Sequence, residues 1–303
     1  MNSVELESVS LWYGNVVAVN DVSMSLGPGV TGLLGPNGAG KTTVLHMMAG
    51  FLPPSRGTVT IGGATAWRNP EIYRKVGIVV EREAVPSFLT GYEFVLASAR
   101  LQKLDDPVGA AQRAITLVEM NDAAGRKMDT YSKGMRQRTR VAAALVHEPD
   151  VLLLDEPFNG MDPRQRMHMM DLLHTMGEAG RTVLFSSHIL EEVEQVSGTV
   201  QVIVAGRLAA SGDFRTIRRL MTHRPHVFAI RSNDDRRLAV ALLAEHSVAG
   251  VDVAATGLEV RASDYGAFTR ALPKIAIREG VRVSQLRPSD ESLESVFSYL
   301  VAQ

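Results

Sequence analysis

The sequence contains no cysteine. This absence excludes disulfide frameworks and thiolate metal sites, and it is compatible with a reducing cytoplasm. A strong excess of either charge is also missing, because 32 Lys and Arg residues stand against 33 Asp and Glu residues. Nothing in the overall charge therefore indicates a nucleic acid as the partner.

Long apolar runs are missing as well. No stretch reaches the roughly 18 to 20 uninterrupted apolar residues of a membrane-spanning helix, and the longest runs are short pieces such as residues 238–244. If a membrane is involved, we expect it to be spanned by another chain. The first nine residues, MNSVELESV, are acidic and lack the basic-then-apolar order of a secretory signal, so we expect the protein to stay where it is made.

The chain has 303 residues, of which 45% are hydrophobic and 21% are charged. These fractions are typical of globular proteins and argue against a disordered or fibrous chain. The length favours two domains.

Short apolar runs alternate with segments of helical periodicity along the first two thirds of the chain. Such runs predict strands of a largely parallel α/β sheet that is covered on both faces. The expected strands are 30–34, 76–80, 151–154, 182–185 and 200–204. Between the second and third of these, a strand-poor section at about 84–146 predicts an inserted helical subdomain.

A basic segment ending in a proline, FRTIRRLMTHRP at 214–225, predicts a domain boundary. We place the domains at 1–220 and 221–303. The second domain shows strand and helix patterns in the order β-α-β-β-α-β, followed by a last helix near 291–301, which predicts a small α+β domain.

A glycine-rich loop joins an expected strand to an expected helix: Gly35, Pro36, Asn37, Gly38, Ala39, Gly40, Lys41, Thr42 and Thr43. This GxxxxGK[ST] string in this context is typical of a Walker A phosphate loop. The glycines let backbone N–H groups approach phosphate oxygens, and the start of the helix adds partial positive charge. We expect Lys41 to reach the β- and γ-phosphates and Thr42 to ligate Mg²⁺. The alternative is a plain strand-to-helix turn.

Two carboxylates, Asp155 and Glu156, end the apolar strand VLLLDEP. The carboxyl ends of parallel strands form the crevice in which α/β sheets bind ligands. We expect Asp155 to hold Mg²⁺ and Glu156 to orient and deprotonate the attacking water. An acidic turn without a catalytic role is the alternative.

Between these motifs lies YSKGMRQR, residues 131–138, at the start of an expected helix. Lys133, Arg136 and Arg138 lie where the helix macrodipole disfavours cations, and Gly134 weakens the first turn. These features predict an anion bound at this helix start. The alternative is that Ser132 is an ordinary N-cap and the arginines are solvated.

With these segments in the order phosphate loop, YSKGM, VLLLDEP, NGMD and SSH, the sequence resembles the ATP-binding subunits of ABC transporters over about residues 4–215. YSKGM is similar to variants of the family's signature motif in the ABC-2 exporter branch. The resemblance implies a P-loop NTPase core with a mostly parallel sheet, an antiparallel N-terminal β subdomain and the inserted helical subdomain. In the family, the residues matching Ser132 and Gly134 contact the γ-phosphate of ATP held by the opposite subunit.

The resemblance assigns roles to further residues. Tyr13 matches the aromatic residue that stacks on adenine, with a core tyrosine as the alternative and Trp12 as a substitute. Asp162 matches the D-loop aspartate at the dimer interface, although it also precedes Pro163 as an N-cap candidate. His188 matches the switch histidine, which contacts the γ-phosphate and positions the water.

Glu81 departs from the family pattern, because it stands where the family has a glutamine that reaches Mg²⁺ or the water. A carboxylate can still serve as a metal ligand. It also adds negative charge near Asp155, Glu156 and the triphosphate.

The resemblance therefore implies an ATPase that binds ATP and Mg²⁺, closes as a homodimer or as a heterodimer with a related subunit, and drives a separate transmembrane permease. It implies a peripheral position on the cytoplasmic face of the membrane. The C-terminal domain resembles the extension of ABC-2 exporter ATPases, which favours export and a role in dimer stability or closure. The alternatives are a non-transport ABC-type ATPase and a binding module with a dead site.

Overall fold

The computed structural model describes residues 3–81, 85–220, 225–254, 256–289, 293–294 and 297–298, without the side chains of 218–220. The chain forms two compact units, Met1–Ser211 and Gly212–Gln303. The sequence placed the boundary after residue 220. The structure instead groups the helix α8 (Phe214–Leu220) with the second unit.

A six-stranded sheet with the order β10-β9-β3-β8-β7-β6 is the centre of the first unit. Strand β3 pairs in parallel with β8 and β9, and β7 pairs in parallel with β6 and β8. The predicted α/β sheet is thereby confirmed. Its strands are β3 (Gly29–Leu34), β6 (Val76–Val79), β7 (Val151–Asp155), β8 (Thr182–Ser186), β9 (Thr199–Val204) and β10 (Arg207–Asp213).

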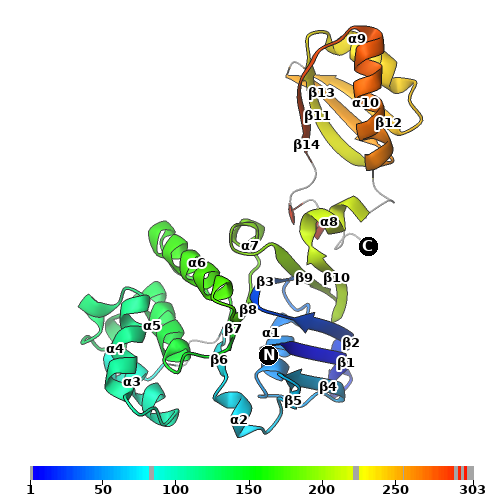
Figure 1. Cartoon of the computed structure of the whole chain (residues 1–303). Helices are drawn as coiled ribbons and strands as arrows, with labels where there is room; N and C mark the ends of the chain where they lie inside the picture. Colours follow the sequence, from blue (N-terminus) through cyan, green and yellow to red (C-terminus); the bar gives the residue numbers. More distant parts are fainter. Residues whose placement is uncertain are drawn as a thin grey trace. The chain divides into compact units, whose positions relative to one another are not determined.

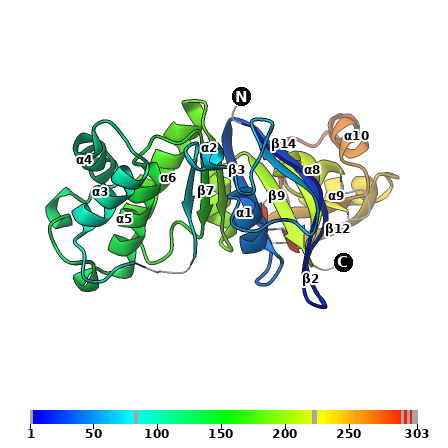
Figure 2. The ribbon, with the colours of Figure 1, turned by 90° about the horizontal axis from the view of Figure 1, so that it is seen from below.

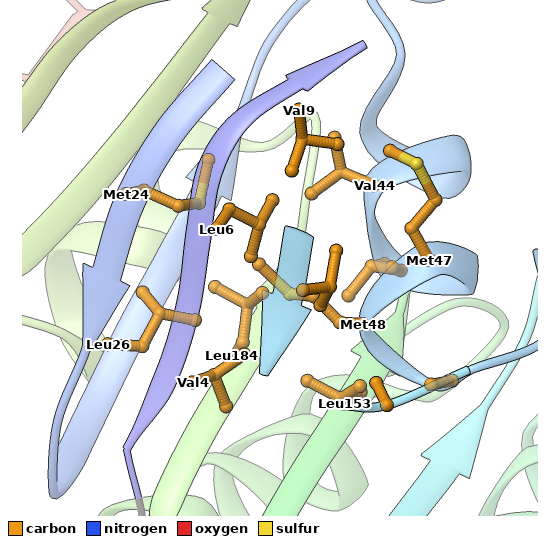
Figure 3. Packing of buried hydrophobic residues seen from close by; sticks show 14 of the residues in the cluster. Val4, Leu6, Val9, Met24, Leu26, Val44, Met47, Met48, Leu153 and Leu184 are labelled. Atoms are coloured by element: carbon orange, nitrogen blue, oxygen red, sulfur yellow. The ribbon is translucent and has the colours of Figure 1, made fainter. Parts of the chain in front are cut away.

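A second, antiparallel sheet with the order β2-β1-β4-β5 packs over helix α1 (Lys41–Met48). The residues between the two sheets form one apolar core. Figure 3 shows side chains of β1 and β2 facing α1, with Leu153 of β7 and Leu184 of β8 in the same cluster. This packing fixes α1, and hence the loop before it, against the sheet. The strands are β1 (Val4–Tyr13), β2 (Val16–Leu26), β4 (Arg56–Ile61) and β5 (Ala64–Thr65).

The predicted helical subdomain follows β6 and lies on that strand's side of the sheet (Figures 1 and 2). Local sequence signals start its helices. Thr90 and Glu93 form a reciprocal capping box, and Asp106 caps a helix that begins with Pro107. The elements are α3 (Gly91–Leu101), α4 (Pro107–Leu117), the 3₁₀ turns η1 (Asn121–Ala123) and η2 (Met128–Thr130), and α5 (Lys133–Leu145).

Among the described residues, the first unit also contains the helices α2 (Pro70–Tyr73), α6 (Pro163–Glu178) and α7 (Leu190–Val196). Of the methionines on α6, Met169, Met170 and Met176 are buried and serve as core residues, whereas Met167 is exposed. None of the helices in the described part of the chain has both the length and the apolar character needed to cross a bilayer.

The second unit has the predicted β-α-β-β-α-β order. Its sheet, β12-β13-β11-β14, is antiparallel throughout, and a separate core built around Phe228, Leu238 and Phe268 joins it to two helices. The helix predicted near 291–301 lies largely outside the described residues. The elements are β11 (His226–Ser232), α9 (Asp235–Leu243), β12 (Val248–Ala254), β13 (Gly257–Ala262), α10 (Tyr265–Glu279) and β14 (Val283–Pro288).

Candidate active site

The loop between β3 and α1 has a backbone that only glycine adopts easily. Gly38 has φ +79° and Gly40 has φ +105°, and a Cβ atom on Gly40 would lie 2.7 Å from the carbonyl oxygen of Ala18. Gly40 is the N-cap of α1 and supplies no side-chain cap. The first N–H groups of this helix therefore lack a side-chain acceptor and can bind an anion.

Lys41 lies inside this loop. Its Nζ donates hydrogen bonds to the carbonyl oxygens of Gly35, at 2.6 Å, and Pro36, at 3.2 Å. Burial lowers the pKa of Lys41, and the carboxylates of Glu156, Asp155 and Glu81 oppose this effect. The ammonium group is thus held in place beside a cluster of acids.

A cavity of about 490 Å³ opens beside the loop. It brings together groups that are far apart in the sequence, which are the loop residues 37–43, Asp155 and Glu156 after β7, and Glu81 after β6. Its remaining wall consists of residues 16–18 at the start of β2. The predicted phosphate loop and both predicted carboxylates therefore share one pocket.

Asp155 is bound on both sides by hydroxyl groups. Thr42 Oγ1 donates to its Oδ2 at 2.7 Å, and Ser186 Oγ donates to its Oδ1 at 2.5 Å. Asp155 is 3% exposed. A carboxylate beside a threonine hydroxyl, with Glu81 in the same cavity, supplies the hard oxygen ligands that Mg²⁺ prefers.

Glu156 is held both at its backbone and at its side chain. Its N–H donates to Ser186 Oγ at 3.0 Å, and its carboxylate faces Nδ1 of His188 at 2.9 Å. Burial raises the pKa of Glu156, although the hydrogen bond and charge of His188 and the charge of Lys41 act in the opposite direction. A largely buried carboxylate with a raised pKa beside a phosphate loop has the properties of a general base.

The segment around Ser132 and Gly134 lies away from the cavity of its own chain. Ser132 is exposed and caps α5, since its Oγ accepts from the N–H of Met135 at 3.2 Å. Gly134 packs so closely that a Cβ atom there would lie 2.6 Å from the carbonyl oxygen of Gly160. Neither residue lines the cavity.

Comparisons with known proteins show which family the chain resembles. Residues 19–159 match the family model described as ABC transporter. The chain is 32% identical to the bacitracin transport ATP-binding protein BcrA of Enterococcus faecalis over 98% of its own length and 96% of that protein. It is also 32% identical to the daunorubicin/doxorubicin resistance ATP-binding protein DrrA of Streptomyces peucetius, over 97% of this chain and 91% of that protein.

The chain belongs to the ABC transporter family. It is an ATP-binding subunit of this family and an ATPase. Its fold is similar to a solved structure described as an ATP-binding subunit of an ABC transporter, with a TM-score of 0.66 and 26% identity over 71% of this chain and 92% of that one. A solved structure described as a dimeric ABC transporter cassette shares this fold, with a TM-score of 0.65 and 23% identity over 69% of this chain and 98% of that one.

Within this ABC subunit, Asp162 is an N-cap. Its Oδ1 accepts from the N–H of Gln165 at 2.8 Å at the start of α6, as one of its two predicted roles required. Neither Tyr13, which is 52% exposed at the end of β1, nor Trp12 lines the cavity. Tyr13 does pair with Val16, which belongs to the cavity wall.

The arginines at the start of α5 need a correction. Arg138 is buried and donates to the carbonyl oxygens of Val118 and Glu119, while Arg136 donates to the carbonyl oxygen of Tyr131. These bonds satisfy backbone groups of the helical subdomain. Arg138 is therefore not solvated, and because both arginines bind backbone carbonyls of their own chain they are not evidence for a bound anion, although Ser132 is indeed an N-cap.

Three residues near the active site have no recognisable role in the sequence. Ser186 joins Asp155 to the backbone of Glu156, and the parallel register that pairs it with Asp155 is the signal that would have revealed it. Gln137 and Arg140 are the other two, on the helix that Ser132 caps. Only their low exposure, 5% for Gln137 and 8% for Arg140, distinguishes them from solvated residues on a helix surface.

Proposed function

We propose that this ABC subunit hydrolyses MgATP at the cavity beside Lys41 and transmits the resulting opening and closing of a dimer to a separate transmembrane permease, as part of an exporter. The arrangement of Asp155 and Glu156 carries the proposal. Asp155 is bonded to the phosphate-loop Thr42, and Glu156 is next to it with His188 on its carboxylate. Metal ligand and base are thus adjacent at the end of one strand.

Mg²⁺ would be held by Thr42, Asp155 and Glu81, directly or through water, together with phosphate oxygens. When bound, it would neutralise charge that develops on the phosphates. Lys41 would leave the carbonyl oxygens of Gly35 and Pro36 and bind the β- and γ-phosphates. The uncapped start of α1 would bind the remaining phosphate oxygens.

Glu156 would accept a proton from the attacking water, and His188 would orient both the water and the γ-phosphate. The raised pKa of Glu156 makes its carboxylate a stronger base than an exposed glutamate. Tyr13, at the edge of the cavity wall, would stack on the adenine.

A second copy would complete each site. Ser132 is exposed at the start of α5. Gly134, in the first turn of the same helix, packs against the loop that contains Gly160, and Asp162 lies at the end of that loop. We assign Ser132, Gly134 and Asp162 to the interface with the other subunit, where Ser132 and Gly134 would contact the γ-phosphate of the ATP that the other subunit holds. Two such sites close one symmetric dimer, of identical or related subunits.

Export is favoured by the relatives that share nearly the full length of the chain. They are named for bacitracin transport and for daunorubicin/doxorubicin resistance, and removal of a compound from the cell is a direct route to resistance. We place the protein at the cytoplasmic face of the membrane, bound to its permease.

The C-terminal unit would stabilise the dimer or regulate its closure. Its own core, around Phe228 and Phe268, makes it a separate compact body appended to the ATPase. Deleting residues from about 222 onward should leave ATP binding intact and weaken ATP-induced dimerisation. Unaltered dimerisation and transport after this deletion would remove both roles.

Mixing two inactive variants tests the shared site. Lys41→Ala breaks the phosphate loop of its own chain, and Ser132→Asp places a negative charge against the γ-phosphate of the other chain. Each variant alone should be inactive. A mixed dimer contains one intact site, formed by Lys41 of one subunit and Ser132 of the other, so the mixture should regain hydrolysis. A mixture that stays inactive while both variants bind to each other would contradict a shared site.

A further inference from the structure

The backbone at Glu156 is in an unfavourable conformation. Its φ is +51°, in the left-handed region that residues with a side chain rarely adopt. Such a conformation persists only where its surroundings hold it. Here the N–H donates to Ser186 Oγ at 3.0 Å, and the carbonyl oxygen accepts from the N–H of Asn159 and from Nε2 of Gln137, both at 3.3 Å.

Gln137 is itself oriented by Arg140, which lies one turn further along α5. Nη1 of Arg140 donates to Oε1 of Gln137 at 2.8 Å. Because a guanidinium can only donate, it fixes the oxygen of the amide on its own side and leaves the NH₂ group directed at Glu156. Both side chains are buried, and the bond between them is shielded from water.

The same guanidinium also binds a second part of the site. Nη2 of Arg140 donates to the carbonyl oxygen of Val80, directly before Glu81. One side chain therefore joins the chain segment that ends in Glu81 to the loop that carries Glu156, and both of these acids line the phosphate cavity. Arg140 itself does not line that cavity.

We propose that Arg140 is a positioning residue of the ATPase site, which acts through Gln137 on the backbone of Glu156 and through Val80 on Glu81. The proposal rests on the role of Glu156 as the base. The Arg140 side chain also links α5, the helix that Ser132 caps, to Glu156 and Glu81 of the same chain.

Arg140→Met and Arg140→Lys test the proposal in the full-length protein. Methionine removes all donors, whereas lysine keeps the charge but lacks the planar fork that serves two acceptors. We expect kcat to fall by about three- to tenfold in Arg140→Met, the effect of losing one or two hydrogen bonds, and less in Arg140→Lys. The KM for ATP should stay within about twofold of the wild type, because the substitution does not remove a contact that binds ATP in the ground state.

Arg138→Lys is the matched control. Arg138 is equally buried in the same helix, but its guanidinium binds the carbonyl oxygens of Val118 and Glu119, away from the cavity. This variant should lower Tm while retaining kcat. Arg140→Lys should lower kcat, and this loss should be present even if the Tm of Arg140→Lys is no lower than the Tm of Arg138→Lys.

Gln137→Met supplies a second, independent readout. If Arg140 acts on Glu156 through Gln137, the double variant Gln137→Met/Arg140→Met should lose less kcat than the product of the two single losses. Fully multiplicative losses would overturn the relay, as would wild-type kcat in Arg140→Met. Glu156→Gln is measured in the same assay: if it is inactive while Arg140→Met is fully active, only the positioning role fails, and if it is fully active, the base assignment fails and the relay with it.

Discussion

Nδ1 of His188 lies 2.9 Å from Oε2 and 3.0 Å from Oε1 of Glu156. An ionised carboxylate can only accept, so this nitrogen carries a proton and donates it to the carboxylate. The histidine side chain is 52% exposed, whereas that of Glu156 is 12% exposed. The pair therefore connects a buried base to the open side of the site, where an attacking water would arrive.

Glu156→Gln should bind ATP but hydrolyse it at least about a hundredfold more slowly, because an amide cannot accept the proton from water. With MgATP, the variant should accumulate as a closed dimer, which light scattering after size-exclusion chromatography would measure. Lys41→Ala in the same background is the control and should stay monomeric. Hydrolysis by Glu156→Gln at the wild-type rate would remove this residue from the role of base.

The pH profile of kcat should report the raised pKa of Glu156. The base must be ionised, so kcat should fall on acidification at a higher pH than an ordinary glutamate would give. His188 lowers this pKa by its hydrogen bond and its charge. In His188→Ala the fall of kcat on the acid side of the profile should therefore occur at higher pH, whatever the maximal kcat of the variant is. A fall that moves to lower pH would contradict the assignment.

Glu81→Gln should weaken the activation of hydrolysis by Mg²⁺ several-fold, since an amide oxygen replaces a carboxylate at the metal. The concentration of Mg²⁺ that gives half-maximal activity at saturating ATP is the measurement. Glu71→Gln is a control, because Glu71 lies on α2 and does not line the cavity. Equal Mg²⁺ dependence in wild type and Glu81→Gln would exclude Glu81 from the metal site.

Gly134→Ala should destabilise the first unit by about 1–3 kcal/mol, despite the better helix propensity of alanine, because the new methyl group would collide with the Gly160 carbonyl. Thermal unfolding monitored by circular dichroism would show a lower Tm. Gly125→Ala, at a position with no atom within 4 Å of the new Cβ, should leave Tm nearly unchanged. A Tm for Gly134→Ala at or above the wild-type value would show that this contact is not tight.

Part of the fold and site was predictable because the relevant signals are local. Strand β7 is an unbroken apolar run, α10 follows from its periodicity, and the phosphate loop is a contiguous string whose glycines require positive φ. The β-α-β-β-α-β order of the second unit follows from the same patterns. In each case the neighbours along the chain supply the physical cause.

Tertiary structure alone decided which partner each buried polar group has. Lys133, Arg136, Arg138 and Arg140 form one basic run in the sequence, yet Arg138 binds backbone carbonyls of the helical subdomain and Arg140 binds Gln137 and Val80. The unit boundary before α8 likewise depends on packing and not on composition. The sequence by itself determined the elements and the phosphate loop, through local backbone and side-chain preferences. The folded structure decided that His188 contacts the carboxylate of Glu156 and that Arg140 reaches the backbone of Glu156 through Gln137. Hydrogen bonds between distant segments depend on how the strands and helices pack.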